Sequence, residues 1–264
     1  MSGAASIRSP LAIFLTVERA LILREAVTRL STERAGWLWV IVEPFEHILF
    51  LMWVHGVLQH HVISGADTPL FIGLGVLGFF MMRNVALRGM EAINANLALF
   101  AYRQVRAADT IIARAVLEAL LTMVIGALLL VGCLLAGVQV MPSSLLTSFL
   151  ALATLWITGI GLAFLMSAGV ALVPEVAQLS RMAFTPLYFF SAVMYPVDWL
   201  PRTTRDVLLW NPLVHSLELV RVGFFPAYHT DPRITPVYPL VVALVIAAAG
   251  LALQVRFSKR LLAR

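Results

Sequence analysis

The sequence predicts an all-α, polytopic membrane protein with six transmembrane helices, an N-terminal amphipathic helix and a re-entrant helical pair before the last span. Of its 264 residues, 61% are hydrophobic and only 12% are charged, and the mean hydropathy is +0.91. A soluble domain of this length needs more polar surface, so the composition excludes a soluble enzyme, a disordered chain and a nucleic-acid-binding module. The apolar runs are long and continuous, which excludes the alternating pattern of an outer-membrane barrel.

The N-terminal segment, residues 1–35, is predicted to form a cytoplasmic amphipathic helix. Apolar residues recur on one side at helical spacing: Ala20, Leu23, Val27 and Leu30. Charged residues fall on the opposite side: Glu18, Glu25 and Arg29. Such a helix lies in the plane of the membrane. The alternative is a helix packed on the cytoplasmic ends of the spans, and the two interpretations are compatible.

Residues 36–264 are predicted to form one transmembrane domain. Each of its six apolar segments is long enough to cross about 30 Å of hydrocarbon at 1.5 Å per residue. These segments are 36–58, 69–90, 111–138, 145–173, 176–195 and 237–255. Arginines gather in the N-terminal segment and around the second and third spans, and the tail is basic, whereas the links 59–68 and 139–144 contain no basic residue. The positive-inside rule therefore places both termini in the cytoplasm.

The first two predicted spans contain ionisable residues, which are costly inside a bilayer and usually face a partner or a wet cavity. The first span contains Glu43, Glu46 and His47, and the second contains Arg83 and Arg88 at similar depth. One interpretation is a structural ion pair between a glutamate and an arginine that fastens the two spans. The other is a polar lining for a translocation path.

The segment between the fifth and sixth spans is predicted to form two short helices that dip into the outer half of the membrane. Two prolines in 194–201 prevent a continuous helix, and Asn211 followed by Pro212 is typical of a helix start. The alternative is an ordinary loop on the outer surface. This segment carries basic residues on the side where the rule expects none: Arg202, Arg205, Arg221 and Arg233.

No catalytic motif is present in the sequence. The single lysine, Lys259, has no glycine-rich turn before it, so the chain has no P-loop and any ATP-driven work needs an ATPase on another chain. Metal-binding and hydrolytic motifs are missing as well, and we expect no metal site. The cytoplasmic link 99–114 mixes aromatic and basic residues, so it is either a docking site for another protein or a solvated basic link.

Several segments resemble ABC type 2 permeases of polysaccharide export, and most closely the inner-membrane permeases of bacterial group 2 capsular polysaccharide export. The first is RAGWLWVIVEP at 34–44, which resembles the entry to the first span in this class. The more specific ones are LFAYRQV at 99–105, DTIIAR at 109–114, PLYFFS at 186–191 and LLWNPLVH at 208–215 with Glu218. The resemblance covers essentially the whole chain.

The resemblance implies a permease that is not itself an enzyme and carries no cofactor. It would work as a homodimer bound to two copies of a separate ATPase, which would bind ATP and Mg. Its substrate would be a long acidic polysaccharide on a lipid carrier, joined by a Kdo linker. A periplasmic adaptor and an outer-membrane polysaccharide export protein would complete the route from the bacterial inner membrane. The helices at 197–225 would match the re-entrant pair at the channel exit.

The resemblance also suggests which residues carry each role. The coupling helix is the part of this chain that would contact the ATPase. It would contain Tyr102, Arg103, Val105, Arg106 and Asp109. The translocation path would be lined by Glu43, Glu46, His47, Arg83, Arg88, Tyr188 and Tyr195. The periplasmic exit would present Trp199, Arg202, Arg205, Trp210 and Arg221 to an acidic polymer. An equally weighted alternative pairs the exit arginines with Asp198, Asp206 and Glu218.

Two other functions stay open at this point. The first is an ABC type 2 permease for a different lipid-linked glycan, such as an O-antigen. The second is a self-sufficient secondary transporter in which Glu43, Glu46 and His47 relay protons. The lack of paired, broken spans in two halves of the sequence weighs against the secondary transporter.

Overall fold

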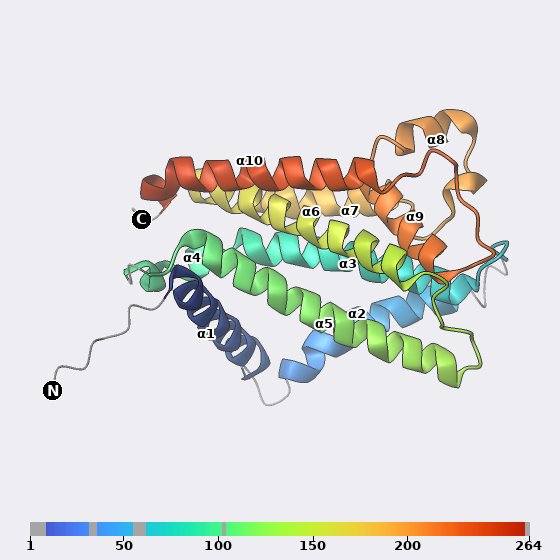
Figure 1. Cartoon of the computed structure of the whole chain (residues 1–264), viewed down its shortest axis with the longest axis horizontal. Coiled ribbons are helices and arrows are strands. Elements are labelled where there is room, and N and C mark those ends of the chain that lie inside the picture. Colours follow the sequence, from blue (N-terminus) through green and yellow to red (C-terminus); the bar gives the residue numbers. More distant parts are fainter. Residues whose placement is uncertain (1–8, 32–35, 55–61, 102–103, 262–264) are drawn as a thin grey trace.

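The computed structural model describes residues 9–31, 36–54, 62–101 and 104–261, and these residues form helices and connecting segments without a strand. The side chains of a few residues within these ranges, Glu43 among them, are not described. Four of the described helices are long and apolar enough to cross a membrane. They are α3 (Thr68–Met90), α5 (Ala107–Leu135), α6 (Leu145–Leu172) and α10 (Val237–Leu261). These four helices run alongside one another (Figure 1).

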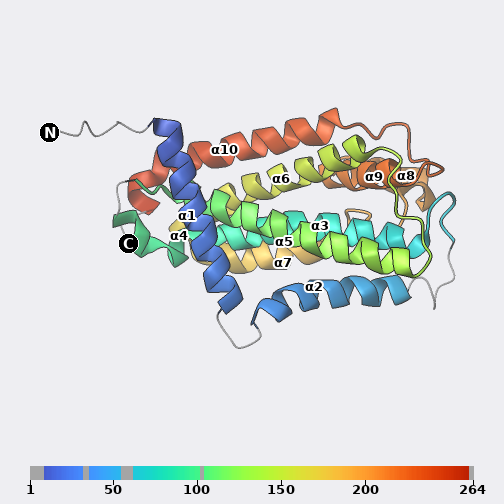
Figure 2. The same cartoon turned by 60° about the horizontal axis from the view of Figure 1, so that its bottom comes forward.

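Two further helices match predicted spans but are shorter. Helix α2 (Gly36–Trp53) has 18 residues and α7 (Val176–Phe189) has 14. At 1.5 Å per residue they rise about 27 Å and about 21 Å. The predicted helix over 176–195 thus ends at Phe189, three residues after Pro186, and Ala192 beyond it has a positive φ of 53°. Both helices follow the direction of the long ones (Figure 2).

Helix α3 is the centre of the molecule. It packs on α2, α5, α6, α7 and α9 (Pro212–Phe224). Of its most apolar stretch of 18 residues, 78% is buried. The contact with α6 is close because Gly159 has no side chain. A Cβ at Gly159 would lie 2.8 Å from the Met82 carbonyl oxygen of α3. This close packing places the two ends of α3 at fixed positions relative to the helices around it.

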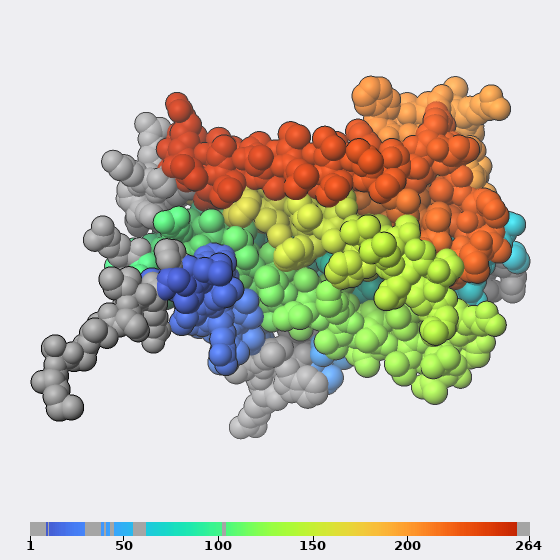
Figure 3. All heavy atoms as spheres, in the orientation of Figure 1, coloured from blue at the N-terminus to red at the C-terminus, as the bar shows by residue number. Residues whose placement is uncertain are grey.

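The short elements divide between the two ends of the bundle (Figure 1). Helix α1 (Pro10–Ser31), α4 (Ala92–Ala95), the 3-10 helix η2 (Leu97–Ala101) and the last turns of α10 lie at one end, called here the α1 end. The 3-10 helix η3 (Val197–Trp199), α8 (Arg202–Leu208) and α9 lie at the other, called the α8 end. Helix α8 rises beyond α10 on the surface (Figure 3).

The predicted helix start at Asn211 is confirmed. The Asn211 side-chain oxygen accepts a hydrogen bond of 3.0 Å from the Leu213 amide, and Pro212 occupies the first helical position. An asparagine cap satisfies one of the backbone amides that a helix leaves unpaired at its start. Asp67 caps α3 in the same way, accepting from the Leu70 amide at 2.9 Å.

Candidate functional site

A cavity of about 820 Å³ opens near the α1 end, between α1, α2, α3 and α7. We call it the basic cavity, because its lining contains four arginines and only two glutamates. The lining residues are Arg29, Trp39, Glu46, His47, Phe50, Phe80, Arg83, Asn84, Leu87, Arg88, Glu91 and Arg181. The structure therefore brings together four of the residues predicted for a translocation path: Glu46, His47, Arg83 and Arg88.

Phe80 organises the middle of the basic cavity. The Arg83 guanidinium lies 5.1 Å from the Phe80 ring centroid, and the His47 ring centroid lies 5.1 Å from the same ring. A guanidinium within about 6 Å of an aromatic face is attracted by the ring quadrupole. Sequence reasoning missed Phe80, although its spacing of three from Arg83 puts both on one side of a helix.

The predicted ion pair of Glu43 or Glu46 with Arg83 or Arg88 does not form through Glu46. Among the described residues, Glu46 forms no ion pair, and its side chain is exposed in the cavity. Arg88 has a nearer carboxylate, because its Nε lies 3.9 Å from Glu118 Oε1 on α5. The side chain of Glu43 lies outside the described residues, so its predicted contact with an arginine stays a prediction.

Helix α1 attaches to the bundle through its polar side. Arg29 pairs with Glu118, whose side chain is only 4% exposed, and Glu25 Oε1 lies 2.9 Å from Arg114 Nε. Apolar side chains on the other side of α1 are more than half exposed: Leu23 and Val27. This arrangement agrees with both interpretations of the amphipathic helix, since its polar side contacts the protein and its apolar side faces outward. Sequence reasoning missed Glu118.

The predicted coupling residues lie at the α1 end. Tyr102 and Arg103 fall outside the described residues. Val105 is half-buried and Arg106 is exposed, while Asp109 is buried and accepts a hydrogen bond of 2.9 Å from the Arg106 amide. Asp109 therefore caps the start of α5.

Glu18 of α1 is an unpaired carboxylate close to this cap. It is 7% exposed, and neither carboxylate oxygen has a hydrogen-bond partner within the described part of the chain. Burial and, secondarily, the Asp109 carboxylate raise the pKa of Glu18 to about 7. Sequence analysis placed Glu18 on the polar side of the helix but gave no sign that it would be buried without a partner.

The two predicted path tyrosines do not line the basic cavity. The Tyr188 ring packs edge-on against Phe79 at 5.1 Å and lies 6.3 Å from Phe80, so it contacts the cavity only through the Phe80 side chain. The Tyr195 hydroxyl donates a hydrogen bond of 2.7 Å to the Phe189 carbonyl. Tyr195 thus helps to close the end of α7 rather than to line this cavity.

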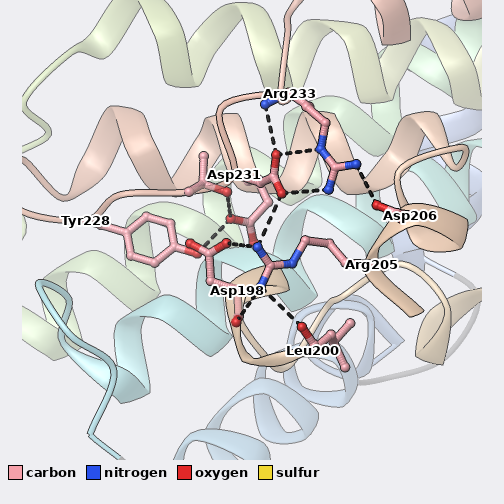
Figure 4. A network of polar contacts seen from close by, with 9 residues as sticks. Asp198, Leu200, Arg205, Asp206, Tyr228, Asp231 and Arg233 are labelled. Carbon is pink, nitrogen blue, oxygen red and sulfur yellow. Dashed lines mark hydrogen bonds and ion pairs between the residues drawn. The ribbon is translucent and has the colours of Figure 1, made fainter. Parts of the chain in front are cut away.

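Two arginines at the α8 end, Arg205 and Arg233, pair with carboxylates (Figure 4). Arg205 Nη1 lies 3.0 Å from Asp198 and 3.3 Å from Asp231, and Arg233 lies 2.9 Å from Asp231 and 2.6 Å from Asp206. Hydrogen bonds from Arg233, with a further one from Arg205, hold the pKa of Asp231 well below its usual range. Sequence reasoning missed Asp231, which both arginines share.

Arg221 was predicted to present its charge to an acidic polymer at the periplasmic exit, but its guanidinium does not reach the surface. Its side chain is completely buried, with Nη1 2.8 Å from Glu218 Oε1. The pairing alternative therefore holds for Arg205 and for Arg221. Three other predicted exit residues do reach the surface of the chain: Trp199, Arg202 and Trp210.

The basic cavity and the α8 end differ in what they can bind. The basic cavity offers Arg83, which has no carboxylate partner among the described residues, together with aromatic rings: Trp39, Phe50 and Phe80. It is suited to an anionic group attached to an apolar or ring-shaped molecule. No group of three His, Cys, Asp or Glu side chains in the described ranges could hold a metal ion.

Residues 16–225 match the family model described as ABC-2 type transporter. The chain is 36% identical over 247 residues to the polysialic acid transport protein KpsM of Escherichia coli. The matched residues cover 90% of this chain and 92% of that protein. It is 30% identical over 242 residues to the capsule polysaccharide export inner-membrane protein CtrC of Neisseria meningitidis, covering 91% and 90%. It is 28% identical over 222 residues to the capsule polysaccharide export inner-membrane protein BexB of Haemophilus influenzae, covering 83% and 82%.

Proposed function

The chain belongs to the ABC-2 type transporter membrane family, and on this premise we propose that it is the transmembrane subunit of an ATP-driven exporter that moves capsular polysaccharide across the bacterial inner membrane. The observation that carries the proposal is similarity over nine-tenths of the chain to KpsM and CtrC, which are polysaccharide transport and export proteins by name. The apolar helices fit a multi-pass membrane subunit.

An ATPase on a separate chain would supply the energy, with ATP and Mg bound there, because this sequence has no P-loop. Its docking site would be the link before α5, where Arg106 is exposed and follows Tyr102 and Arg103 in the sequence. The functional unit would contain two copies of this chain and two of the ATPase. Both termini would face the cytoplasm together with the α1 end.

The six spans would be α2, α3, α5, α6, α7 and α10, with α8 and α9 as the re-entrant pair at the outer mouth. Alternating direction supports this assignment, because successive helices of the set run in opposite directions along the bundle (Figure 1). The short rise of α7 is compatible with a span if residues 190–196 complete the crossing within a protein-covered segment.

The basic cavity would be the inner part of the translocation path. Arg83 would bind acidic groups of a lipid-linked polysaccharide, and Trp39, Phe50 and Phe80 would contact its apolar or ring parts. Trp199, Arg202 and Trp210 would meet the polymer at the outer mouth. A periplasmic adaptor and an outer-membrane export protein would then receive it.

Purification of the intact membrane complex tests the proposal. An ATPase subunit should co-purify, and its hydrolysis rate should rise with an acidic capsular glycolipid and not with a neutral O-antigen-type glycolipid. Stimulation by the neutral glycan alone would favour a different lipid-linked substrate. Absence of any co-purifying ATPase would favour a self-sufficient transporter.

The substitution Arg83→Gln tests the role of the basic cavity. It removes the cavity arginine that has no carboxylate partner within the described part of the chain, and it should lower export of an acidic polymer while the protein still inserts. The matched control is Arg256→Gln, on the exposed side of α10 and away from the cavity. Equal export by both variants would show that Arg83 does not contact the polymer.

A further inference from the structure

Helix α7 is loosely packed along its length. Phe184 is its one fully buried residue, whereas Leu179, Met182 and Phe189 are more than half exposed. Its first half contributes Arg181 to the basic cavity. Because so little of α7 is buried, its position depends on how its ends are attached.

Side chains of α9 hold the chain just beyond the end of α7. The Asn211 side-chain amide donates to the Phe190 carbonyl at 3.0 Å. The Arg221 guanidinium donates from Nη1 to the Ala192 carbonyl at 2.9 Å and from Nη2 to the Val193 carbonyl. These carbonyls belong to the segment that follows the last helical residue, Phe189, and Ala192 has the positive φ that ends the helical path.

The surroundings of Arg221 fix its guanidinium in one orientation. Glu218 accepts its hydrogen bond at 2.8 Å and also accepts from the Tyr228 hydroxyl at 2.7 Å and the Thr230 hydroxyl at 2.6 Å. The guanidinium lies 3.8 Å from the centroid of the Phe71 ring of α3.

Gly75 of α3 provides the space for this guanidinium. A Cβ at Gly75 would collide with both Arg221 Nη2 and the Val193 carbonyl oxygen. Because Gly75 has no side chain, the Arg221 guanidinium can lie against α3 there and reach the segment that follows α7.

We propose that Arg221 is a positioning residue that joins the outer end of α7 to α9, so that the α7 wall of the basic cavity moves together with the helices at the α8 end. Tyr188 lies next to this end and packs on Phe79, close to Phe80. The Phe80 ring in turn contacts the Arg83 guanidinium. A buried ion pair is by itself weak support for stability, and a role in specifying geometry explains a buried Arg221 better. The cavity's role in transport rests on the proposed function, whereas the attachment of α7 does not.

Two substitutions disturb this attachment in different ways. Gly75→Ala keeps both charges but pushes on the contact between Arg221 and Val193. Arg221→Lys keeps the charge opposite Glu218 but cannot reproduce the planar fork that reaches Glu218 and two carbonyls together. The matched control is Gly132→Ala on α5, where an added Cβ meets nothing within 4 Å.

Spin labels measure the attachment directly in the full chain reconstituted in lipid nanodiscs. Cys133 is replaced by alanine, and labels are placed at Met182 on α7 and Val207 on α8, both exposed. We expect one narrow distance distribution in the parent protein and in Gly132→Ala, and a broadened one in Gly75→Ala and Arg221→Lys. A reference pair at Val207 and Val245 should keep its distribution in every variant, which identifies the variants as folded.

Capsule export by the same variants gives the second readout. Gly75→Ala and Arg221→Lys should lose export, and Gly132→Ala should retain it. An unchanged distribution between Met182 and Val207 in both variants would overturn the proposal, and so would normal export accompanied by a broadened distribution. If the protein exports no capsule at all, the broadening should still appear, so failure of the proposed function is distinguishable from failure of this inference. If one variant does not fold, the other still decides.

Discussion

Glu18 shows how one residue can make α1 sensitive to pH. Its pKa is raised from 4.5 to about 7 because its carboxylate is buried without a hydrogen-bond partner in the described part of the chain and lies near Asp109. The folded protein therefore holds a proton that the unfolded chain releases at lower pH. The resulting penalty is absent below about pH 4.5, grows as the pH rises through the window to 7, and is complete above it.

The substitution Glu18→Gln should remove this penalty. At pH 8 the variant should be more stable than the parent by about 1–3 kcal/mol, because a pKa shift of one unit corresponds to about 1.4 kcal/mol. At pH 4.5 the two should be nearly equal. Thermal unfolding of the purified protein across this pH range measures the difference, with the exposed neighbour Arg19→Gln as the control. A pH dependence that survives in Glu18→Gln would contradict the assignment.

Among the elements, α1 has an orientation that follows from its attachments. Glu25 and Arg29 turn toward α5, and this leaves Leu23 and Val27 facing outward. A helix with polar contacts on the protein side and apolar residues outside is suited to the membrane interface, where those residues can enter the lipid. The cluster around Glu118 therefore decides whether α1 lies against the bundle.

Removing the charge of Glu118 should release α1. Glu118→Gln leaves the largely buried Arg29 without its carboxylate, and losing one partner of a buried pair costs about 3–5 kcal/mol. The matched control is Glu91→Gln, which breaks the exposed pair with Arg181 and should cost about 0–1 kcal/mol. Thermal unfolding and protease cleavage after α1 compare the two. Similar stability and similar cleavage would argue against the attachment of α1 through Glu118.

The long apolar helices were predictable, whereas the ends of the short ones were not. The predicted spans 69–90 and 145–173 agree closely with α3 and α6, because length and continuous hydrophobicity are sufficient to define them. The predicted span 176–195 extends beyond the end of α7, because the sequence remains apolar through residues 190–195. The end of α7 depends instead on Asn211 and Arg221, which are distant in sequence.

The candidate site was predictable in residue type but not in pairing. Ionisable residues at one depth in two spans were compatible with an ion pair or with a polar lining, and four of them line the basic cavity. The interaction partners of the arginines lie on other parts of the chain. Glu118, which pairs with Arg88, lies on α5, and the burial of the Arg221 side chain depends on the space left by Gly75. Spacing within one helix permitted the Glu218–Arg221 pair but could not choose it over an exposed arginine.

On the scale of the whole molecule, the two ends carry basic residues in different ways. At the α8 end, Arg205 and Arg233 are matched by aspartates, with Asp231 held ionised between them. In the basic cavity near the α1 end, arginines outnumber glutamates. The arginines between the fifth and sixth predicted spans are therefore compatible with an outer location, because Arg205, Arg221 and Arg233 pair with carboxylates and, among the described ion pairs, Arg202 alone of the four has none.

This distribution leads to a prediction about topology that tests the six-span arrangement. Single cysteines in a Cys133→Ala background are placed at four exposed positions: Arg106, Met141, Glu175 and Val207. In intact spheroplasts, an impermeant maleimide should label positions 141 and 207, at the α8 end, and should label 106 and 175, at the α1 end, only after permeabilisation. Positions 175 and 207 are decisive, because α7 is the short helix between them. If both react from the outside, α7 does not cross the membrane, the number of crossings falls below six, and the α1 and α8 ends cannot be assigned to opposite sides of the bilayer as proposed.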